Sequence, residues 1–164
     1  MANGSLRELY LDELDDLYDS ETQMLLTLPR LAEAAHSQAL KETLRRQCIE
    51  AQCHLERLEL IFTHWGEPRR GRRCAGLAAI VQEADDRVNA PTTLPARDLT
   101  IIGVAHRITH YEIAAYGTAR LYARWLNRLD DARLIEETLI DEDRADRRLT
   151  EIAEAQIEAS QPAA

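Results

Sequence analysis

Apolar residues recur at helical spacing over almost the whole chain, and this periodicity constrains the fold more than any other feature. One helical face, for example, carries Ile101, Ala105, Ile108, Ala115 and Leu126. Only 6 glycines and 5 prolines are available to break such helices, and the sequence has no alternating apolar run of strand length. The pattern therefore predicts an all-α fold made of a few long helices.

Breaks in the periodicity divide the chain into four long helices and one short one. Ser5 is a favourable N-cap with Glu8 three residues later, and Gly66 followed by Pro68 ends a later helix. We expect long helices over residues 5–35, 38–65, 96–128 and 130–160, and a short helix over 74–88. Two antiparallel hairpins joined by a long crossover with a short extra helix are typical of a ferritin-like four-helix bundle. A chain of 164 residues is expected to form a single domain, residues 1–164.

Acidic side chains occur where these helices should be most apolar. Glu21, Glu112 and Glu142 fall within apolar stripes, and Glu50 lies beside the stripe of its helix, at the expected edge of the core. A buried carboxylate costs several kcal/mol unless a charge or a metal compensates it. A single acid of this kind more often turns to solvent or pairs with an arginine. Four at matching positions instead predict a bound cation.

The spacing of the acids from the expected turns places them at one height in the bundle. In an antiparallel hairpin, residues equally distant from the turn lie side by side. In each hairpin one glutamate lies 16 or 17 residues before the turn and another lies 13 residues after it, with a further candidate ligand four residues later. The predicted metal ligands are therefore Glu21, Glu50, His54, Glu112, Glu142 and Asp146.

This set of side chains is suited to two metal ions with bridging and terminal carboxylates. Oxygen ligands with few imidazoles favour iron or manganese over a zinc-only site. The pattern departs from the usual Glu-x-x-His pair, because His54 is four residues after Glu50 and Asp146 stands where a histidine is common. A literal Glu-x-x-His occurs at Glu33 and His36, but it lies at the first turn, too far along the helix axis to join the acids.

Other candidate residues receive weaker assignments. His106 and His110 are four residues apart and could chelate a metal, but the helical rotation turns them away from Glu112. A supporting role or a place on a dimer surface is favoured for them over ligation. Tyr111 and Tyr116 flank Glu112, and a tyrosine there could hydrogen-bond a ligand or carry a radical, but ordinary packing is favoured for both. Glu83, in the short helix, is expected to be solvated, although it could cover an open coordination position.

Composition and charge exclude several classes of protein. A net charge of −9 argues against nucleic-acid binding, and the one basic cluster, in EPRRGRRC, is expected to be a solvated loop. The sequence has no apolar run long enough to span a membrane, and MANGSLREL lacks the features of a secretion signal, so we expect a cytoplasmic protein. The 3 cysteines match no zinc module and are expected to be reduced thiols.

Four stretches carry a resemblance to a known family: LDDLYDSETQMLLTLPRLAEAA, HLERLELIF, HYEIAAYGTAR and ETLIDEDRADRRLTEIA. Over nearly its whole length the chain resembles the YciE/YciF stress-protein family, a branch of the ferritin-like superfamily. The resemblance implies a four-helix bundle with an extra short helix, a homodimer, and a metal site whose biochemical role is poorly defined. Carried over by position, the metal-type acids of the family fall on Glu21, Glu50, Glu112 and Glu142, with His54 and Asp146 beside them.

Two hypotheses for function remain open at this point. In the first, two iron or manganese ions act oxidatively, as in a ferroxidase or an enzyme that consumes peroxide or oxygen, with a small-molecule oxidant as partner. Glu50 and Glu142 would then bridge or chelate, and the other four residues would complete the coordination of each ion. In the second, the protein is a non-catalytic helical stress scaffold or interaction protein with a vestigial metal site. Whether the chain is an enzyme is not decided by the sequence.

Overall fold

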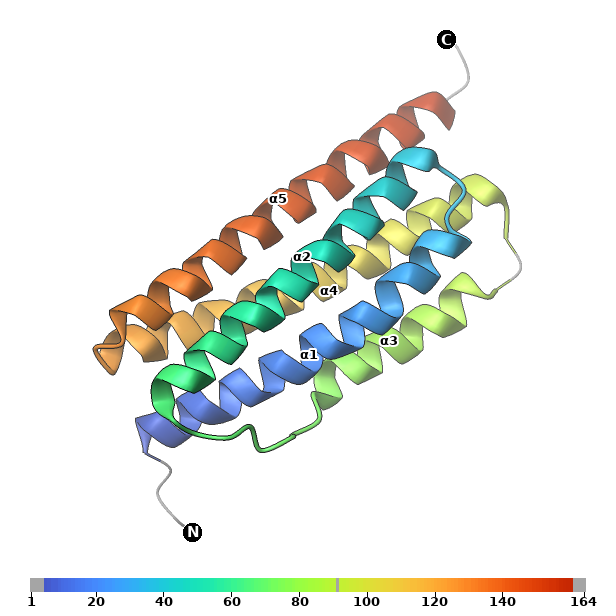
Figure 1. Ribbon diagram of the computed structural model, residues 1–164. Coiled ribbons are helices and arrows are strands. Elements are labelled where there is room, and N and C mark those ends of the chain that lie inside the picture. Colours follow the sequence, from blue (N-terminus) through green and yellow to red (C-terminus); the bar gives the residue numbers. More distant parts are fainter. Residues whose placement is uncertain (1–4, 91, 161–164) are drawn as a thin grey trace.

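The computed structural model describes residues 5–90 and 92–160, and within these residues the chain forms five helices and no strand. The all-α prediction is confirmed. The helices are α1 (Leu6–Ala34), α2 (Gln38–Trp65), α3 (Ala75–Val88), α4 (Leu94–Trp125) and α5 (Leu129–Ser160), as labelled in Figure 1. The predicted domain, residues 1–164, includes residues 1–4, 91 and 161–164, which lie outside the described part, and it stays a prediction.

Local capping explains where several helices begin and end. The Ser5 hydroxyl accepts the Glu8 N–H, and the Glu8 carboxylate in turn accepts the Ser5 N–H, which forms the predicted capping box of α1. Gly66 ends α2 in the left-handed conformation, at φ 62°. Helix α4 begins two residues earlier than predicted because Pro95 is accommodated in its first turn. It ends three residues earlier, and Asn127 just beyond it adopts a left-handed φ of 56°.

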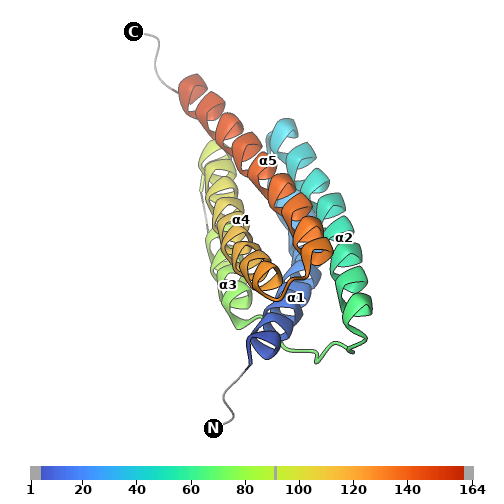
Figure 2. The same ribbon diagram turned by 90° about the vertical axis from the view of Figure 1, so that its left-hand side faces the viewer.

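The four long helices form two antiparallel hairpins, α1 with α2 and α4 with α5. Helix α1 also packs against α4 and α2 against α5, so the four helices surround a common interior. The short helix α3 lies in the crossover between the hairpins and packs against α4 and α1 (Figures 1 and 2). Among the described residues, no helix combines the length and apolar character needed to span a membrane.

The crossover is held against α1 by buried or partly buried carboxylates. Asp15 accepts hydrogen bonds from three consecutive backbone N–H groups, at residues 70–72, over distances of 3.0, 3.2 and 2.6 Å. Asp19 accepts the N–H of Cys74, the residue that precedes α3. The exposed arginines of the same loop pair with α1 as well, since Arg70 and Arg72 both contact Asp12. The basic cluster is therefore a solvated loop that binds the acids of α1.

The apolar core consists of two clusters separated by a polar layer. One cluster includes Met24, Leu44, Ile108 and Leu149, and the other includes Leu17, Leu58, Tyr116 and Ile135. Along every long helix the sequence passes from one cluster to the other near the middle. The residues at these crossing points are polar and buried: Glu21, His54, Glu112 and Glu142. The fold thus brings one ionisable side chain from each long helix to the centre of the molecule.

Candidate metal centre

Three of these side chains meet in the interior. Glu21 from α1, His54 from α2 and Glu142 from α5 each offer a ligand atom, and these atoms lie within 4.8 Å of one another. His54 Nδ1 is 2.9 Å from Glu21 Oε1 and 3.6 Å from Glu142 Oε1. Only 1% of the surface of Glu21 and of His54 is exposed, and 7% of Glu142. Such convergence of ionisable groups away from water requires compensation by protons or by a cation.

Helix α4 completes the polar layer with Glu112 and Tyr116. Glu112 is 2% exposed and accepts a hydrogen bond of 2.9 Å from the Ser20 hydroxyl. The Tyr116 hydroxyl donates to Glu21 Oε1 over 2.7 Å. We refer to Glu21, His54, Glu112 and Glu142 as the core cluster. Each of its members comes from a different long helix, as the positions relative to the turns predict.

The electrostatics show how the core cluster is compensated when no cation is bound. Burial raises the pKa of Glu112 well above its usual value, and the nearby carboxylates of Glu21 and Glu142 raise it further. Burial also raises the pKa of Glu142, to about 8, with Glu21 among the acids that add to the effect. Burial alone would lower the pKa of His54, but the neighbouring carboxylates, Glu21 foremost, outweigh it and the net pKa is well above normal. Protons therefore occupy the centre near neutral pH.

Three polar residues outside the predicted ligand set also contact the core cluster: Tyr116, Asp141 and Ser20. Burial and the adjacent Glu21 raise the pKa of Tyr116, so its phenol stays protonated and donates. In the sequence Tyr116 flanks Glu112, and packing is favoured there over the hydrogen bond to a ligand that the structure shows. Asp141 Oδ2 lies 3.5 Å from His54 Nε2, and His54, together with Arg57, lowers the pKa of Asp141 to about 2. Ser20 gave no signal, since serine is common in such positions.

Glu50 does not join the core cluster. Both of its carboxylate oxygens lie 3.0 Å from Nη2 of Arg148, at the edge of the interface between α2 and α5. Its charge nevertheless contributes to the raised pKa of Glu142. Four residues separate Glu50 from His54, a rise of about 6 Å along α2 with a rotation of about 40°, and this offset places Glu50 beside Arg148.

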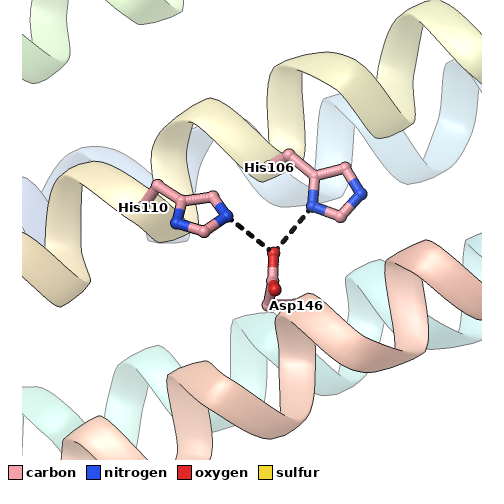
Figure 3. A group of neighbouring side chains, drawn as sticks. All are labelled: His106, His110 and Asp146. Carbon is pink, nitrogen blue, oxygen red and sulfur yellow. Dashed lines mark hydrogen bonds and ion pairs between the residues drawn. The ribbon is translucent and has the colours of Figure 1, made fainter.

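Asp146 is turned away from the core cluster in the same manner. Its Oδ1 atom lies 2.8 Å from His106 Nδ1 and 3.1 Å from His110 Nε2 (Figure 3). Neither histidine belongs to the group around Glu21, which agrees with the prediction that helical rotation turns them away from Glu112, but their contact with Asp146 is not predicted by the sequence. Four of the six predicted ligands thus lie together in the centre, and the other two have different partners.

The remaining candidates lie outside the layer. Glu33 and His36 are exposed at the end of the first hairpin, away from the acids, as expected. Glu83 is half exposed and pairs with Arg87 on the surface of α3. The Tyr111 hydroxyl contacts Cys74 Sγ at 3.1 Å, so this tyrosine packs α4 against the start of α3. None of these four residues belongs to the core cluster as defined above.

Comparisons with known proteins agree over nearly the whole chain. A family model described as a domain of unknown function (DUF892) matches residues 5–161. Protein YciF of Escherichia coli K12 is 27% identical over 154 residues, which cover 93% of each chain. The crystal structure of the E. coli stress protein YciF superposes with a TM-score of 0.90 at 26% identity, covering 94% of this chain and 98% of that one. YcfI from Rhodopseudomonas palustris, described as a candidate structural protein, gives 0.87 at 29% identity, covering 92% and 97%.

Proposed function

We propose that this chain, which belongs to the DUF892 family and is a homologue of the stress protein YciF, is a ferritin-like protein that binds iron or manganese in its core cluster. The resemblance to the YciE/YciF family seen in the sequence is confirmed by the same matches. The two hairpins and the long crossover support the ferritin-like assignment. Two observations carry the proposal: the ligand atoms of buried Glu21, His54 and Glu142 lie within 4.8 Å of one another, and buried Glu112 is close enough for the carboxylates of Glu21 and Glu142 to raise its pKa.

The donor set fits such an ion. Three carboxylates and one imidazole are the hard, oxygen-rich combination that suits iron and manganese. His54 presents Nδ1 to the carboxylates of Glu21 and Glu142, while its Nε2 is buried and has only Asp141 Oδ2 nearby, at 3.5 Å. A divalent or trivalent cation would also replace the protons that Glu112 and Glu142 retain because their pKa values are raised.

The present arrangement supports one ion in the core cluster. The two-ion site predicted from the sequence needs Glu50 to leave Arg148 and Asp146 to leave the two histidines. Counting bound ions per chain separates the two possibilities.

The surrounding residues suit an oxidative role with a very small substrate. Iron or manganese bound here would supply electron transfer to peroxide or dioxygen. Tyr116 and Ser20 orient the carboxylates of Glu21 and Glu112 by hydrogen bonds. Because the cluster is almost completely closed to solvent, only a small oxidant or a metal ion could reach it, past Glu142, its most exposed member. This favours a ferroxidase or a peroxide- or oxygen-consuming activity.

A second candidate function is a non-catalytic scaffold or interaction protein. It is favoured by the observation that the acids already have protein partners, namely Ser20 for Glu112 and Tyr116 with His54 for Glu21. The description of YcfI as a candidate structural protein agrees with this reading. The homodimer and the cytoplasmic location stay predictions, and light scattering of the purified chain tests the first of them.

Anaerobic titration of chelator-treated full-length protein with Fe²⁺ or Mn²⁺ tests the proposal. Bound metal is measured by elemental analysis after gel filtration. Wild type is expected to retain one ion per chain, and Glu112→Gln and Glu142→Gln to bind at least tenfold more weakly. The matched control is Glu154→Gln, an exposed glutamate on α5, which should bind like wild type. A wild type that retains neither metal contradicts the proposal and leaves the scaffold as the function.

A further inference from the structure

A second cluster of metal-ligating side chains lies outside the core cluster, on the α4–α5 hairpin. His106 and His110 lie one turn apart on the same face of α4, with ring centroids separated by 6.3 Å. Asp146 reaches them from α5. Figure 3 shows both rings turned toward the one carboxylate, between the two helices. We call these three residues the surface triad.

The ligand atoms of the surface triad converge on one point. The two rings use different atoms, Nδ1 of His106 and Nε2 of His110, yet both approach the same oxygen, Oδ1 of Asp146, at 2.8 and 3.1 Å. All three ligand atoms lie within 4.8 Å of one another. A metal with bonds of about 2.0–2.2 Å holds its donors roughly 3–4 Å apart. Only a small movement of the side chains is therefore needed to seat an ion between them.

Exposure distinguishes the surface triad from the core cluster. The side chains of His106 and Asp146 are 26% and 25% exposed, and that of His110 is 63% exposed. An ion could enter directly from solvent and keep coordination positions open to water or to another ligand. A hydrogen-bonded pair that only joined the helices would need a single histidine. The second ring, that of His110, is largely in water, where its ion pair with Asp146 adds little to the stability of the fold but its nitrogen can serve as a metal ligand.

The chemistry of the donors selects the class of metal. Two imidazole nitrogens and one carboxylate oxygen are typical of zinc sites with an open position and of non-haem iron(II) sites, and they also suit cobalt, nickel and copper. Calcium and magnesium prefer all-oxygen coordination. The core cluster, with three carboxylates and one imidazole, favours harder ions.

We propose that His106, His110 and Asp146 form a second, solvent-accessible site for a divalent transition-metal ion of the zinc class. Such an ion would join α4 to α5 near the middle of both helices. This site is independent of the core cluster and assigns to Asp146 a role different from the core ligation predicted from the sequence.

Zinc titration of the chelator-treated full chain by calorimetry tests this proposal. The Glu142→Gln variant serves as background, because its core cluster is weakened. The Glu142→Gln variant is expected to bind one Zn²⁺ per chain, in the surface triad. Adding His110→Ala, a change at an exposed position, should weaken that binding at least tenfold. Adding His36→Ala, which removes an exposed histidine elsewhere, should not change it. The same comparison in the wild-type background should show the loss of one zinc equivalent with His110→Ala only.

A spectroscopic readout separates ligation from a merely structural role. In protein labelled with ¹⁵N-histidine, zinc should shift the Nδ1 resonance of His106 and the Nε2 resonance of His110. The proposal is overturned if the Glu142→Gln background binds no zinc, if His110→Ala leaves its zinc affinity unchanged, or if neither nitrogen resonance moves. Failure of the core proposal has a different signature, because Glu112→Gln and Glu142→Gln would then leave iron or manganese binding as in wild type.

Discussion

Replacement of Glu142 by glutamine should change how the stability of the metal-free protein depends on pH. Glu142 is buried beside Glu21 and His54, and its pKa is raised from 4.5 to about 8, first by burial and then by neighbouring acids. Between these two pH values the folded protein keeps a proton that the unfolded chain releases. The stabilisation from this proton is fully present below about pH 4.5 and is lost as the pH rises through 8.

The expected magnitude follows from the two pKa values. Each pH unit in this window is worth about 1.4 kcal/mol, so between pH 5 and pH 8 Glu142 alone should remove about 3 kcal/mol from the free energy of unfolding. For a chain of this size that corresponds to a fall in Tm of roughly 6–12 °C. His54 contributes in the same direction, because its pKa is raised as well and its stabilising proton is also lost as the pH rises.

Urea denaturation of chelator-treated protein at pH 5, 6, 7 and 8 measures this effect. Wild type and the control Glu154→Gln should lose stability along the series. Glu142→Gln cannot ionise, so its loss should be smaller by about 3 kcal/mol, and at pH 8 it should be more stable than wild type. Equal stability of metal-free wild type at pH 5 and pH 8, or identical pH profiles for wild type and Glu142→Gln, would refute the reasoning.

Three further outcomes are expected. The rise in Tm caused by saturating Mn²⁺ should be larger at pH 8 than at pH 6, since the metal competes with protons for the same carboxylates, and a rise independent of pH would contradict a carboxylate site. Asp98→Ala should lower the free energy of unfolding, measured by urea denaturation, by about 3 kcal/mol. Asp98 is buried and accepts hydrogen bonds from two backbone N–H groups of the α1–α2 turn, at 2.6 and 2.7 Å. A loss below about 1 kcal/mol would show that the turn does not depend on this side chain. Gly76→Ala should lower the free energy of unfolding by about 1–2 kcal/mol, since a Cβ there would lie 2.8 Å from the ring of Tyr111. Gly103→Ala has open space around the new Cβ and should leave this free energy unchanged or raise it in the same assay.

The fold was predictable to the extent that its determinants are local. The hydroxyl of Ser5 caps α1, and Gly66, which has no side chain, adopts the left-handed conformation that ends α2. Both helix ends were therefore predicted to within one residue. The end of α4 was not, because an asparagine at 127 in the left-handed conformation has no unique local signature. The division of the core into two apolar clusters with a polar layer between them follows from the apolar stripes and from the positions of the acids within them.

The candidate site was predictable in height but not in direction. Rise per residue is nearly constant, so counting from the turns predicts one level for Glu21, His54, Glu112 and Glu142, and the structure buries all four near one another. Which way a side chain points at that level depends on how each helix is rotated against its neighbours. An offset of four residues, about 6 Å of rise with about 40° of rotation, gives Glu50 and Asp146 other partners, an arginine and two histidines. A single sequence does not fix that rotation.

The composition of the core cluster has a consequence for how the molecule assembles. The first hairpin supplies Glu21 and His54 and the second supplies Glu112 and Glu142, so neither hairpin holds the full set of charges by itself. Before the hairpins dock, Glu112 and Glu142 lack both the burial and the facing carboxylate of Glu21 that raise their pKa values in the folded protein. Docking is therefore the folding step that takes up protons. In alkaline solution the two halves of the chain meet with like charges facing each other, and the association of the hairpins should become the slow, pH-sensitive event in folding.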